Sequence, residues 1–364
     1  MLTIISIFIL LNLLYWLFIF NKLSHYYYQR LYKNKPPATH LISKTAIVIA
    51  VKNEEQNIKK NLLSFLNQKP SGYKLVLVDD YSKDNTLHII DNYSQQYPYL
   101  KVLKNKYESG KKYALSYAIQ NIEEKYLLFT DADCYVKSEN WLVKMTSLFN
   151  NQVKIILGYS PYTGKTFLSK FIRFETFMTA VQYFSYAILG IPYMGVGRNI
   201  AIDKAFFIKN KGYESNFDIK SGSDDLFVNE NANARNTAIQ IDPDTFIYST
   251  PAKTLNEFIK QKTRHISTSF RYKIIHKILL ALYSLSHIGV YLLLIVGIFF
   301  LPLKLVIILW LLRIIIILTV SYRSFVLLKE KDLFIWLPIL DFLMFVYYFY
   351  MGVYYFFADK NKWK

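Results

Sequence analysis

The chain has 364 residues, of which 53% are hydrophobic and 17% aromatic, and this composition excludes an ordinary soluble enzyme of that length. Its formal charge of +18 comes from 44 basic and 26 acidic residues and would suit a nucleic-acid-binding protein. The basic residues, however, gather beside apolar stretches, which favours anionic lipid headgroups and argues against nucleic acid as a partner. The lone cysteine, Cys134, permits no intramolecular disulfide and fits a reducing compartment.

Four apolar stretches predict helices that span a membrane. The first runs from Leu2 to Phe20, which is roughly the 20 residues that cross a bilayer. No small-residue cleavage site follows it, so we interpret residues 1–22 as a retained anchor and not as a signal peptide. The other candidates lie within residues 278–358: Ile278 to Phe300, Leu303 to Val320, and Leu333 to Phe357.

Basic residues beside these stretches predict the orientation of the chain. They follow the first span and precede the second, a pattern that marks the cytoplasmic side of the inner, or cell, membrane. The residues concerned are Lys22, Arg30, Lys33, Lys35, Lys253, Lys260, Lys262, Arg264, Arg271, Lys273 and Lys277. The region between the spans is therefore expected in the cytoplasm. Three spans after it would place the basic tail, residues 359–364, outside, so either the last segment does not fully cross or the rule fails locally.

Residues 45–252 follow a basic, tyrosine-rich linker at 23–44 and alternate short apolar strands with helical stretches. This alternation predicts a single α/β domain. The expected strands include Thr45–Val51, Lys74–Val78, Leu100–Lys104 and the apolar start of Tyr126–Cys134. Ligands in such sheets bind at the carboxyl ends of the strands, and acidic residues follow three of these strands.

These acidic residues suggest a site for a nucleotide and a metal ion. The alternate spacing of Asp131 and Asp133 lets one or both face the same cation, and hard oxygen ligands suit Mg2+ or Mn2+ when substrate phosphates complete the shell. A solvated turn is the alternative. Asp79 and Asp80 suit a ribose or base, or else they cap the next helix. Lys111, at a helix start, can neighbour a pyrophosphate or simply face solvent.

Four of these segments, AVKNEE, VDDYSKDNT, SGKKYAL and TDADC, together carry a resemblance to the inverting family 2 glycosyltransferases of the GT-A fold. The resemblance covers residues 45 to about 270. It implies a Rossmann-like domain with a mixed, mostly parallel sheet, flanked here by one N-terminal and about three C-terminal spans. It also implies that Ala50, Glu54 and Asp80, with Asp79 beside it, bind the base of a nucleotide sugar. Asp131 and Asp133 would carry the metal and the donor diphosphate.

The resemblance also assigns residues to the acceptor side. A glycine-containing segment in the family lines the acceptor site, which corresponds here to Gly197, Arg198 and Asn199, with a plain β-bulge as the alternative. The family usually shows Glu-Asp where this chain has Asp224 and Asp225. Residue matching makes Asp225 the base that deprotonates the acceptor hydroxyl, with a helix cap as the alternative role for this segment.

Two helical segments complete the domain. An aromatic stripe at 165–189 predicts packing in the core or docking on the membrane surface. Residues 253–277 predict an amphipathic interfacial helix, where membrane polysaccharide synthases of the family carry Gln-x-x-Arg-Trp. Gln261 and Arg264 match this motif, and the arginine fork suits the donor diphosphate. His265 replaces the tryptophan at the acceptor end, which puts processive polymerisation in doubt.

The expected function is therefore transfer of a sugar, with inversion, from a nucleotide sugar to a lipid-linked or polysaccharide acceptor in cell-envelope glycan synthesis. The nucleotide is expected to be UDP, by its frequency in the family. Two rivals stay open: a processive synthase that extrudes its product, and a membrane scaffold with a catalytically dead transferase domain.

Overall fold

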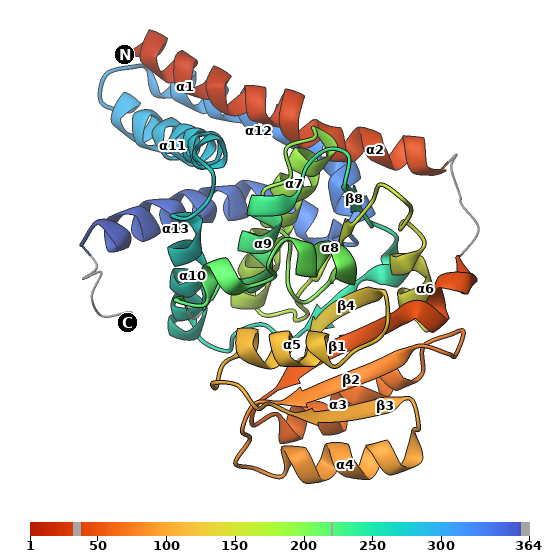
Figure 1. Ribbon diagram of the computed structural model, residues 1–364. Coiled ribbons are helices and arrows are strands. Elements are labelled where there is room, and N and C mark those ends of the chain that lie inside the picture. The colour runs from red at the N-terminus through yellow and green to blue at the C-terminus, as the bar shows by residue number, and fades with distance from the viewer. Residues whose placement is uncertain (32–37, 220, 358–364) are drawn as a thin grey trace.

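A computed structural model describes residues 1–31, 38–219 and 221–357. The linker prolines, Pro36 and Pro37, and the basic tail at 359–364 lie outside the described residues. Within them, a mixed sheet and its covering helices form the lower part of Figure 1, and long apolar helices extend from it at the upper left.

The central sheet has seven strands in the order β3-β2-β1-β4-β7-β6-β8. Its parallel part consists of β1 (Thr45–Val51), β2 (Lys74–Asp79), β3 (Leu100–Lys104) and β4 (Tyr126–Asp131). The order then turns antiparallel at β7 (Ile200–Asp203), which pairs with both β4 and β6 (Ile155–Leu157), and β8 (Thr237–Ile239) runs parallel to β6. A small second sheet joins β5 (Cys134–Val136) to β9 (Ile247–Ser249). The predicted mixed, mostly parallel sheet is confirmed.

Helices cover both faces of the parallel strands because their side chains alternate between the two faces. In β1, Ala46 and Val48 pack in the core cluster that contains α5 (Lys111–Gln120), while Ile47 and Ile49 pack in the cluster that contains α3 (Glu55–Leu66) and α4 (Thr86–Gln96). The remaining helices of the domain are α6 (Trp141–Thr146), α7 (Phe167–Ile188), α8 (Lys204–Lys209), α9 (Ser223–Asn231) and α10 (Leu255–Ser269). Of these, α7 and α9 lie between the sheet and the apolar helices in Figure 1.

The aromatic stripe of α7 is core, as predicted. Most of its phenylalanines are buried and contact helices from both the domain and the membrane region. The ring of Phe177 stacks on Phe325 at 4.1 Å between centroids, and Phe171 meets Phe258 of α10 edge-on at 5.8 Å. The helix α7 therefore joins the sheet domain to the apolar helices.

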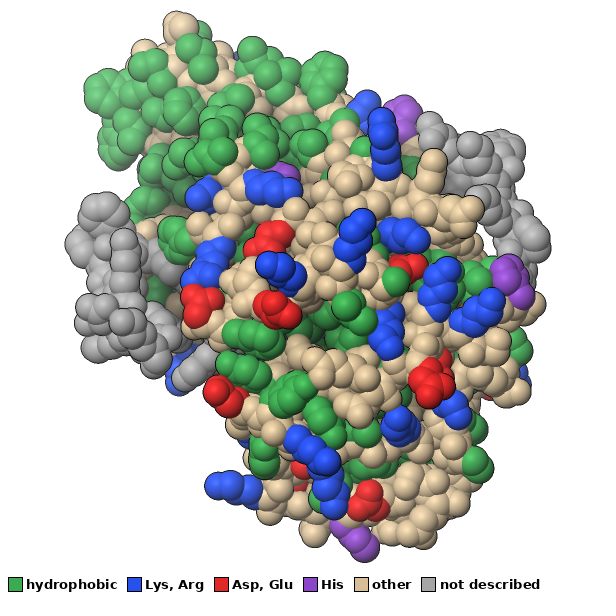
Figure 2. Space-filling model, viewed as in Figure 1, with side chains coloured by type: hydrophobic (Ala, Val, Ile, Leu, Met, Phe, Trp, Pro, Cys, Tyr) green, Lys and Arg blue, Asp and Glu red, His purple; other side chains and the backbone are tan. Residues whose placement is uncertain are grey.

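Within the described residues, four helical segments are long and apolar enough to cross a membrane: Leu2–Tyr26, Ile274–Gly297, Leu303–Leu327 and Lys331–Tyr354. The first comprises α1 (Leu2–Leu14), a π-helical stretch (Tyr15–Phe20) and the start of α2 (Asn21–Leu31). The others correspond to α11 (Ile274–Gly297), α12 (Leu303–Leu327) and α13 (Leu337–Phe357). Their apolar side chains form the green region at the upper left of Figure 2. The prediction of one N-terminal and three C-terminal spans is confirmed.

Two predicted boundaries differ from the structure. The expected linker starts at residue 23, whereas helix α2 continues to Leu31, and near its start Ser24 bonds to α12 through Ser324 and the carbonyl of Val320. The expected interfacial helix extends to residue 277, whereas α10 ends at Ser269 and a short turn at 270–273 separates it from α11.

A polar cluster lies near the middle of the four spans. Arg313 of α12, with 0% of its surface exposed, forms an ion pair with Asp341 of α13 at 2.6 Å and donates a hydrogen bond to Asn12 of α1 at 3.0 Å. His287 and Tyr291 of α11 complete the cluster: Tyr291 donates to Asp341 at 2.6 Å, and a nitrogen of His287 lies 3.2 Å from the Arg313 guanidinium. A charge inside a bilayer requires such partners, so the cluster joins all four helices.

A second ion-pair group ties the membrane helices to the domain. Arg173 of α7 contacts Glu330 and Asp332, which lie in the connection between α12 and α13, at 2.6 Å each. The hydroxyl of Tyr159, just beyond β6, lies 3.4 Å from Glu330. The Glu330 carboxylate therefore contacts two side chains of the sheet domain, Arg173 and Tyr159. These contacts hold the domain against the connection between α12 and α13.

Replacing Arg313 with Met should lower the melting temperature in detergent micelles, because Asp341 would remain buried without its counter-charge. Removing one partner of a buried pair costs about 3–5 kcal/mol. The double variant Arg313→Met/Asp341→Leu should recover most of that loss, since neither charge remains. Leu312→Met, on the neighbouring lipid-facing position with 55% exposure, serves as the control and should melt like the wild type. An Arg313→Met variant that melts at the wild-type temperature would show that the cluster does not hold the spans together.

Candidate functional site

The site begins at the carboxyl ends of three adjacent parallel strands. Strand register sets Ala50 of β1 opposite both Val78 of β2 and Asp131 of β4, and sets Val51 opposite Asp79. The ends of these strands therefore lie in one row, as predicted from the sequence. The acids that follow them lie on the same edge of the sheet.

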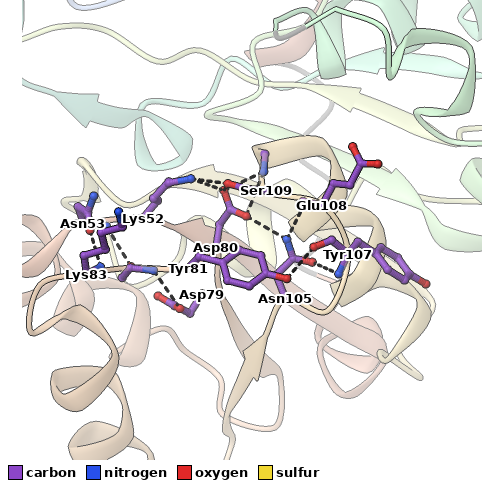
Figure 3. Close-up of polar contacts among 12 residues, drawn as sticks. Lys52, Asn53, Asp79, Asp80, Tyr81, Lys83, Asn105, Tyr107, Glu108 and Ser109 are labelled. Atoms are coloured by element: carbon purple, nitrogen blue, oxygen red, sulfur yellow. Dashed lines mark hydrogen bonds and ion pairs between the residues drawn. The ribbon is translucent and has the colours of Figure 1, made fainter.

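Asp80 is buried at the end of β2 and is surrounded by hydrogen-bond donors (Figure 3). It accepts from the Asn105 amide at 2.9 Å and from the backbone N–H of Gly110 at 2.9 Å, and it pairs with Lys52 at 3.3 Å. Ser109 lies between Lys52 and Asp80. Asp80 thus fixes the backbone at the start of α5, the helix that begins with Lys111.

Asp79 and Glu54 have free capacity for a ligand. One carboxylate oxygen of Asp79 accepts from the backbone N–H of Ser82 at 3.2 Å, while the other is buried and has no hydrogen-bond partner among the described residues. Burial raises the pKa of Glu54, the Asn57 amide opposes that rise, and the nearby charges of Asp133 and Asp131 add to it. Glu54 therefore belongs to the same group of acids as the two aspartates after β4.

Asp131 and Asp133 differ in their surroundings. Asp131 forms an ion pair with Lys111, and although burial raises its pKa, the charge and hydrogen bond of Lys111 outweigh that effect and lower the pKa below its ordinary value. Arg198 and Arg264 add to the lowering. Asp133 is exposed and accepts from Ser249 at 3.0 Å. The site thus contains one carboxylate held by cations and one open to a ligand.

These two carboxylates fit a divalent cation that also binds substrate phosphates. Across the part of the chain that the structure describes, no group of three or more His, Cys, Asp and Glu could hold a metal by itself. Mg2+ and Mn2+ accept one or two protein carboxylates when phosphate oxygens and water supply the remaining ligands. Asp131 and Asp133 would hold such an ion, and Lys111 would have to move away from Asp131 to leave room for it.

Arg198 adjoins this acidic group, since its charge acts on Asp131. Its guanidinium lies 4.4 Å from the centre of the Tyr162 ring and donates to the carbonyl of Ser160 at 3.3 Å, and its other amino nitrogen is buried with no partner among the described residues. Gln261 of α10 donates to the Tyr162 hydroxyl at 3.0 Å. Gln261 therefore supports the ring on which Arg198 lies, and the free nitrogen of Arg198 can donate to an anionic partner.

Asn199 is a buried residue of the domain core. Its side chain is fully buried: the amide nitrogen donates to the carbonyls of Tyr159 and Thr245 at 2.7 Å, and its oxygen accepts from Trp141. All of these partners belong to the domain core, so the Asn199 side chain is held by the core, and its contact with an acceptor stays a prediction. The sequence pattern could not separate it from Arg198, which stands beside it in the chain.

Gly197 and Asp224 are in direct contact. A Cβ atom at position 197 would clash with a carboxylate oxygen of Asp224, so this position needs glycine. Asp224 is buried and accepts from Tyr213 at 2.9 Å and from Ser223 at 2.7 Å. Its charge also acts on Lys111, so the start of α9 adjoins the β4 end of the site.

Asp225 lies at the start of α9, and its surroundings support a chemical role. The N-cap position is Gly222, which has no side chain, so the capping alternative does not apply to these aspartates. Burial raises the pKa of Asp225, while hydrogen bonds from Thr268 and Tyr272 oppose the rise. A carboxylate with a raised pKa is suited to accept a proton near neutral pH.

The helix α10 carries the last predicted residues. Thr254 and Glu257 form a capping box at its start, which fixes where the helix begins. Arg264 and His265 are both exposed, and the charge of Arg264 acts on Asp131. The arginine therefore adds positive charge near Asp131 from the helix that precedes the apolar helix α11.

Several site residues were not predicted from the sequence. Lys52 and Asn105 hold Asp80, Tyr162 holds Arg198, and Thr268 and Tyr272 hold Asp225. Thr268 follows Arg264 by four positions, so helical spacing offered a signal for it. Tyr162 lies in an irregular segment, which gave no periodic pattern to interpret.

Part of the chain is similar in sequence to known proteins. Residues 46–206 match the model of the family described as Glycosyl transferase family 2. The poly(ribitol-phosphate) β-glucosyltransferase of Bacillus spizizenii is 36% identical over 118 residues, which are 32% of this chain and 19% of that protein. The β-monoglucosyldiacylglycerol synthase of Trichormus variabilis is 32% identical over 111 residues, 29% of this chain and 24% of that protein. The aligned region thus spans about a quarter or less of the length of these curated relatives.

A solved structure extends the likeness to nearly the whole chain. The mannosyltransferase PcManGT from Pyrobaculum calidifontis, in complex with GDP-Man and Mn2+, matches with a TM-score of 0.54 over 94% of this chain and 99% of that chain. At 14% identity this likeness shows the fold alone. Residues 46–206 are therefore similar to glycosyl transferase family 2, and the fold of the chain is GT-A.

Proposed function

We propose that this protein transfers a sugar, with inversion, from a nucleotide sugar to a lipid-linked or polysaccharide acceptor at the cytoplasmic face of the cell membrane. The observation that carries the proposal is the ion pair of Asp131, at the end of β4, with Lys111 of α5, to which Arg264 of α10 adds positive charge. A site whose acids are paired with lysine and arginine suits a charged donor. The four apolar helices suit an acceptor at the membrane.

The half of the site at β1, β2 and β4 would bind the donor. Ala50, Glu54, Asp79 and Asp80 would hold the base and ribose of a UDP-sugar, and the unpartnered oxygen of Asp79 would accept an N–H from the base.

The diphosphate of the donor would lie at the end of β4. A metal ion on Asp131 and Asp133 would offset its negative charge. Lys111 and Arg264 would add positive charge from α5 and α10, since both act on Asp131. Gln261 would contribute through its hydrogen bond to Tyr162, the ring that supports Arg198.

The half of the site at α9 would bind the acceptor and carry out the proton transfer. The acceptor oxygen forms a bond to the anomeric carbon while the bond from that carbon to the diphosphate breaks, and the diphosphate leaves with the electron pair. The hydroxyl proton passes to the Asp225 carboxylate. Gly197, Arg198, Asp224 and His265 would line the approach of the acceptor.

Two observations support a membrane-associated acceptor. The site adjoins the helix that leads into the apolar spans, and the aligned relatives are named for a ribitol-phosphate polymer and for a glucosyldiacylglycerol. We assign this chain to the same general class, cell-envelope glycan or lipid glycosylation. A scaffold without activity would not need Asp133 and Asp225 to remain available to ligands.

Asp225→Asn should abolish transfer while donor binding is kept, because an amide cannot accept the proton. We expect a loss of kcat of about 10²–10⁴-fold, the usual contribution of a general base. The measurement is radiolabelled sugar transfer by membranes containing the enzyme, tested with a panel of nucleotide sugars. Glu139→Gln, an exposed surface position, is the control. Unchanged turnover in Asp225→Asn would rule out the assigned base.

Asp133→Ala should remove metal-dependent binding of the donor, because this carboxylate is the one open to an ion. Titration calorimetry of UDP with Mn2+ should show the loss, whereas Glu123→Ala, an exposed position at the opposite edge of the sheet, should bind like the wild type. Wild-type protein that keeps its full donor affinity in EDTA would contradict the metal role of both aspartates.

The enzyme should add single sugars and not long chains, because His265 replaces the tryptophan plane on which a growing chain would rest. With excess radiolabelled donor, gel or thin-layer analysis should show short products of discrete size. High-molecular-weight product at early time points would favour the processive synthase instead.

A further inference from the structure

The two oxygens of the Asp225 carboxylate have different partners. Both hydroxyls that reach it meet the same oxygen: Thr268 Oγ1 lies 2.7 Å and the Tyr272 hydroxyl 3.0 Å from Oδ2. The other oxygen, Oδ1, accepts only from the adjacent backbone N–H of Leu226 at 3.0 Å among the described residues. A carboxylate oxygen has two lone pairs, so Oδ1 keeps capacity for one more proton.

The two hydroxyls belong to the segment that leads into the membrane. Thr268 lies in the last turn of α10 and Tyr272 in the turn at 270–273, two residues before α11 begins at Ile274. Both side chains are buried, with 1% and 6% exposure. The part of the chain that touches the proposed base is thus the junction between α10 and the first C-terminal span.

The helix that carries Asp225, α9, also contacts this junction through a second residue, Asn229. Asn229, one turn further along α9, accepts from the backbone N–H of Lys273 at 2.8 Å, and its amide lies 2.9 Å from a ring nitrogen of His276. The same amide donates to the carbonyl of Tyr193 at 2.7 Å. Two consecutive turns of α9 are therefore fixed against residues 268–276, which limits rotation of α9 about its axis.

We propose that Thr268 and Tyr272 are positioning residues for the transfer reaction, holding Oδ2 of Asp225 so that Oδ1 faces the acceptor hydroxyl and takes its proton. The proposal rests on the function proposed above, in which Asp225 is the base. It extends that function, because the orientation of the base then depends on the junction at which the chain enters the membrane.

The Thr268 hydroxyl has two possible acceptors, the Asp225 carboxylate and a backbone carbonyl, which is consistent with a positioning role. Its Oγ1 also lies 2.7 Å from the carbonyl of His265, and a single hydroxyl hydrogen can go to only one acceptor. A charged carboxylate is the stronger acceptor, so Thr268 donates to Asp225 while Asp225 is ionised. Once Asp225 has taken a proton, the same hydroxyl can turn to the helix carbonyl, and its bond to the carboxyl is no longer favoured.

The charges around Asp225 determine the direction of the expected pH effect. From α9 itself, Asp224 raises the pKa of Asp225, and from α5 the buried Lys112 faces the same carboxylate and attracts it. Burial is the largest cause of the raised pKa, and the two hydroxyl hydrogen bonds lower it. Removing a hydroxyl therefore raises the pKa of Asp225 further. Since the base must be ionised, activity on the acidic side of the pH profile should fall and should return at higher pH.

The test compares the pH profiles of kcat for wild type, Thr268→Val, Tyr272→Phe and Thr268→Ser, with radiolabelled transfer by the full-length protein in membranes. In Thr268→Val and Tyr272→Phe the acidic limb should move to higher pH, lowering kcat on that limb about tenfold for each hydroxyl removed, while KM for the donor stays unchanged. Thr268→Ser keeps the hydroxyl and should retain the wild-type profile. Ser267→Ala, an exposed neighbour on the same helix, is the control.

The outcomes separate this inference from the proposed function. If the wild type transfers sugar and Asp225→Asn does not, but both hydroxyl variants keep the wild-type acidic limb, the positioning role is overturned and the base assignment stands. A uniform loss of kcat at every pH in the two variants also overturns it, because that pattern reports a structural defect. If the wild type transfers no sugar from any donor, the proposed function itself fails. Should Thr268→Val not fold, Tyr272→Phe gives the same comparison.

Discussion

The register of three parallel strands imposes the main constraint on this protein. Because β1, β2 and β4 end at one edge, their acidic residues are drawn together, and like charges at close range must be balanced. The structure supplies cations from other elements: Lys52 beside Asp80, Lys111 beside Asp131, and Arg264 from the helix before the membrane. Much of the remaining architecture, including the start of α5 and the position of α10, follows from bringing these cations to the acids.

The sheet and the acids could be predicted because short apolar runs and their polar exits are local features of the sequence. Leu100–Lys104 matches β3 as predicted, and β1, β2 and β4 lie where their apolar residues indicated. The antiparallel pairing of β7 with β4 had no local signal in the sequence, because the direction of a strand depends on the path of the chain that connects it to its neighbour in the sheet. The neighbours Asn199 and Arg198 depend on the tertiary fold in the same way: the Asn199 side chain bonds to the domain core while that of Arg198 lies on Tyr162, and only the fold distinguishes them.

The residues that sequence reasoning missed are those that hold other side chains in place. Tyr162 supports Arg198, and Thr268 and Tyr272 support Asp225, although each pair is far apart along the chain. Neutral hydroxyls and rings of this kind resemble ordinary core residues in a sequence. The helix α10 is informative here, because it carries both Arg264, whose charge acts on Asp131, and Thr268, which donates to Asp225. A movement of this helix would alter both halves of the site together.

The buried arginine at the centre of α12 also bears on how the protein is made. A charged residue at the middle of a lone helix opposes membrane insertion by about 2.5–3.5 kcal/mol. The counter-charge, Asp341, is 28 positions later, in the final helix. During synthesis α12 would therefore gain its partner only after the ribosome has completed α13, so the last two helices are expected to settle into the lipid as a hairpin. The order of translation and the order of membrane integration need not coincide for this part of the chain.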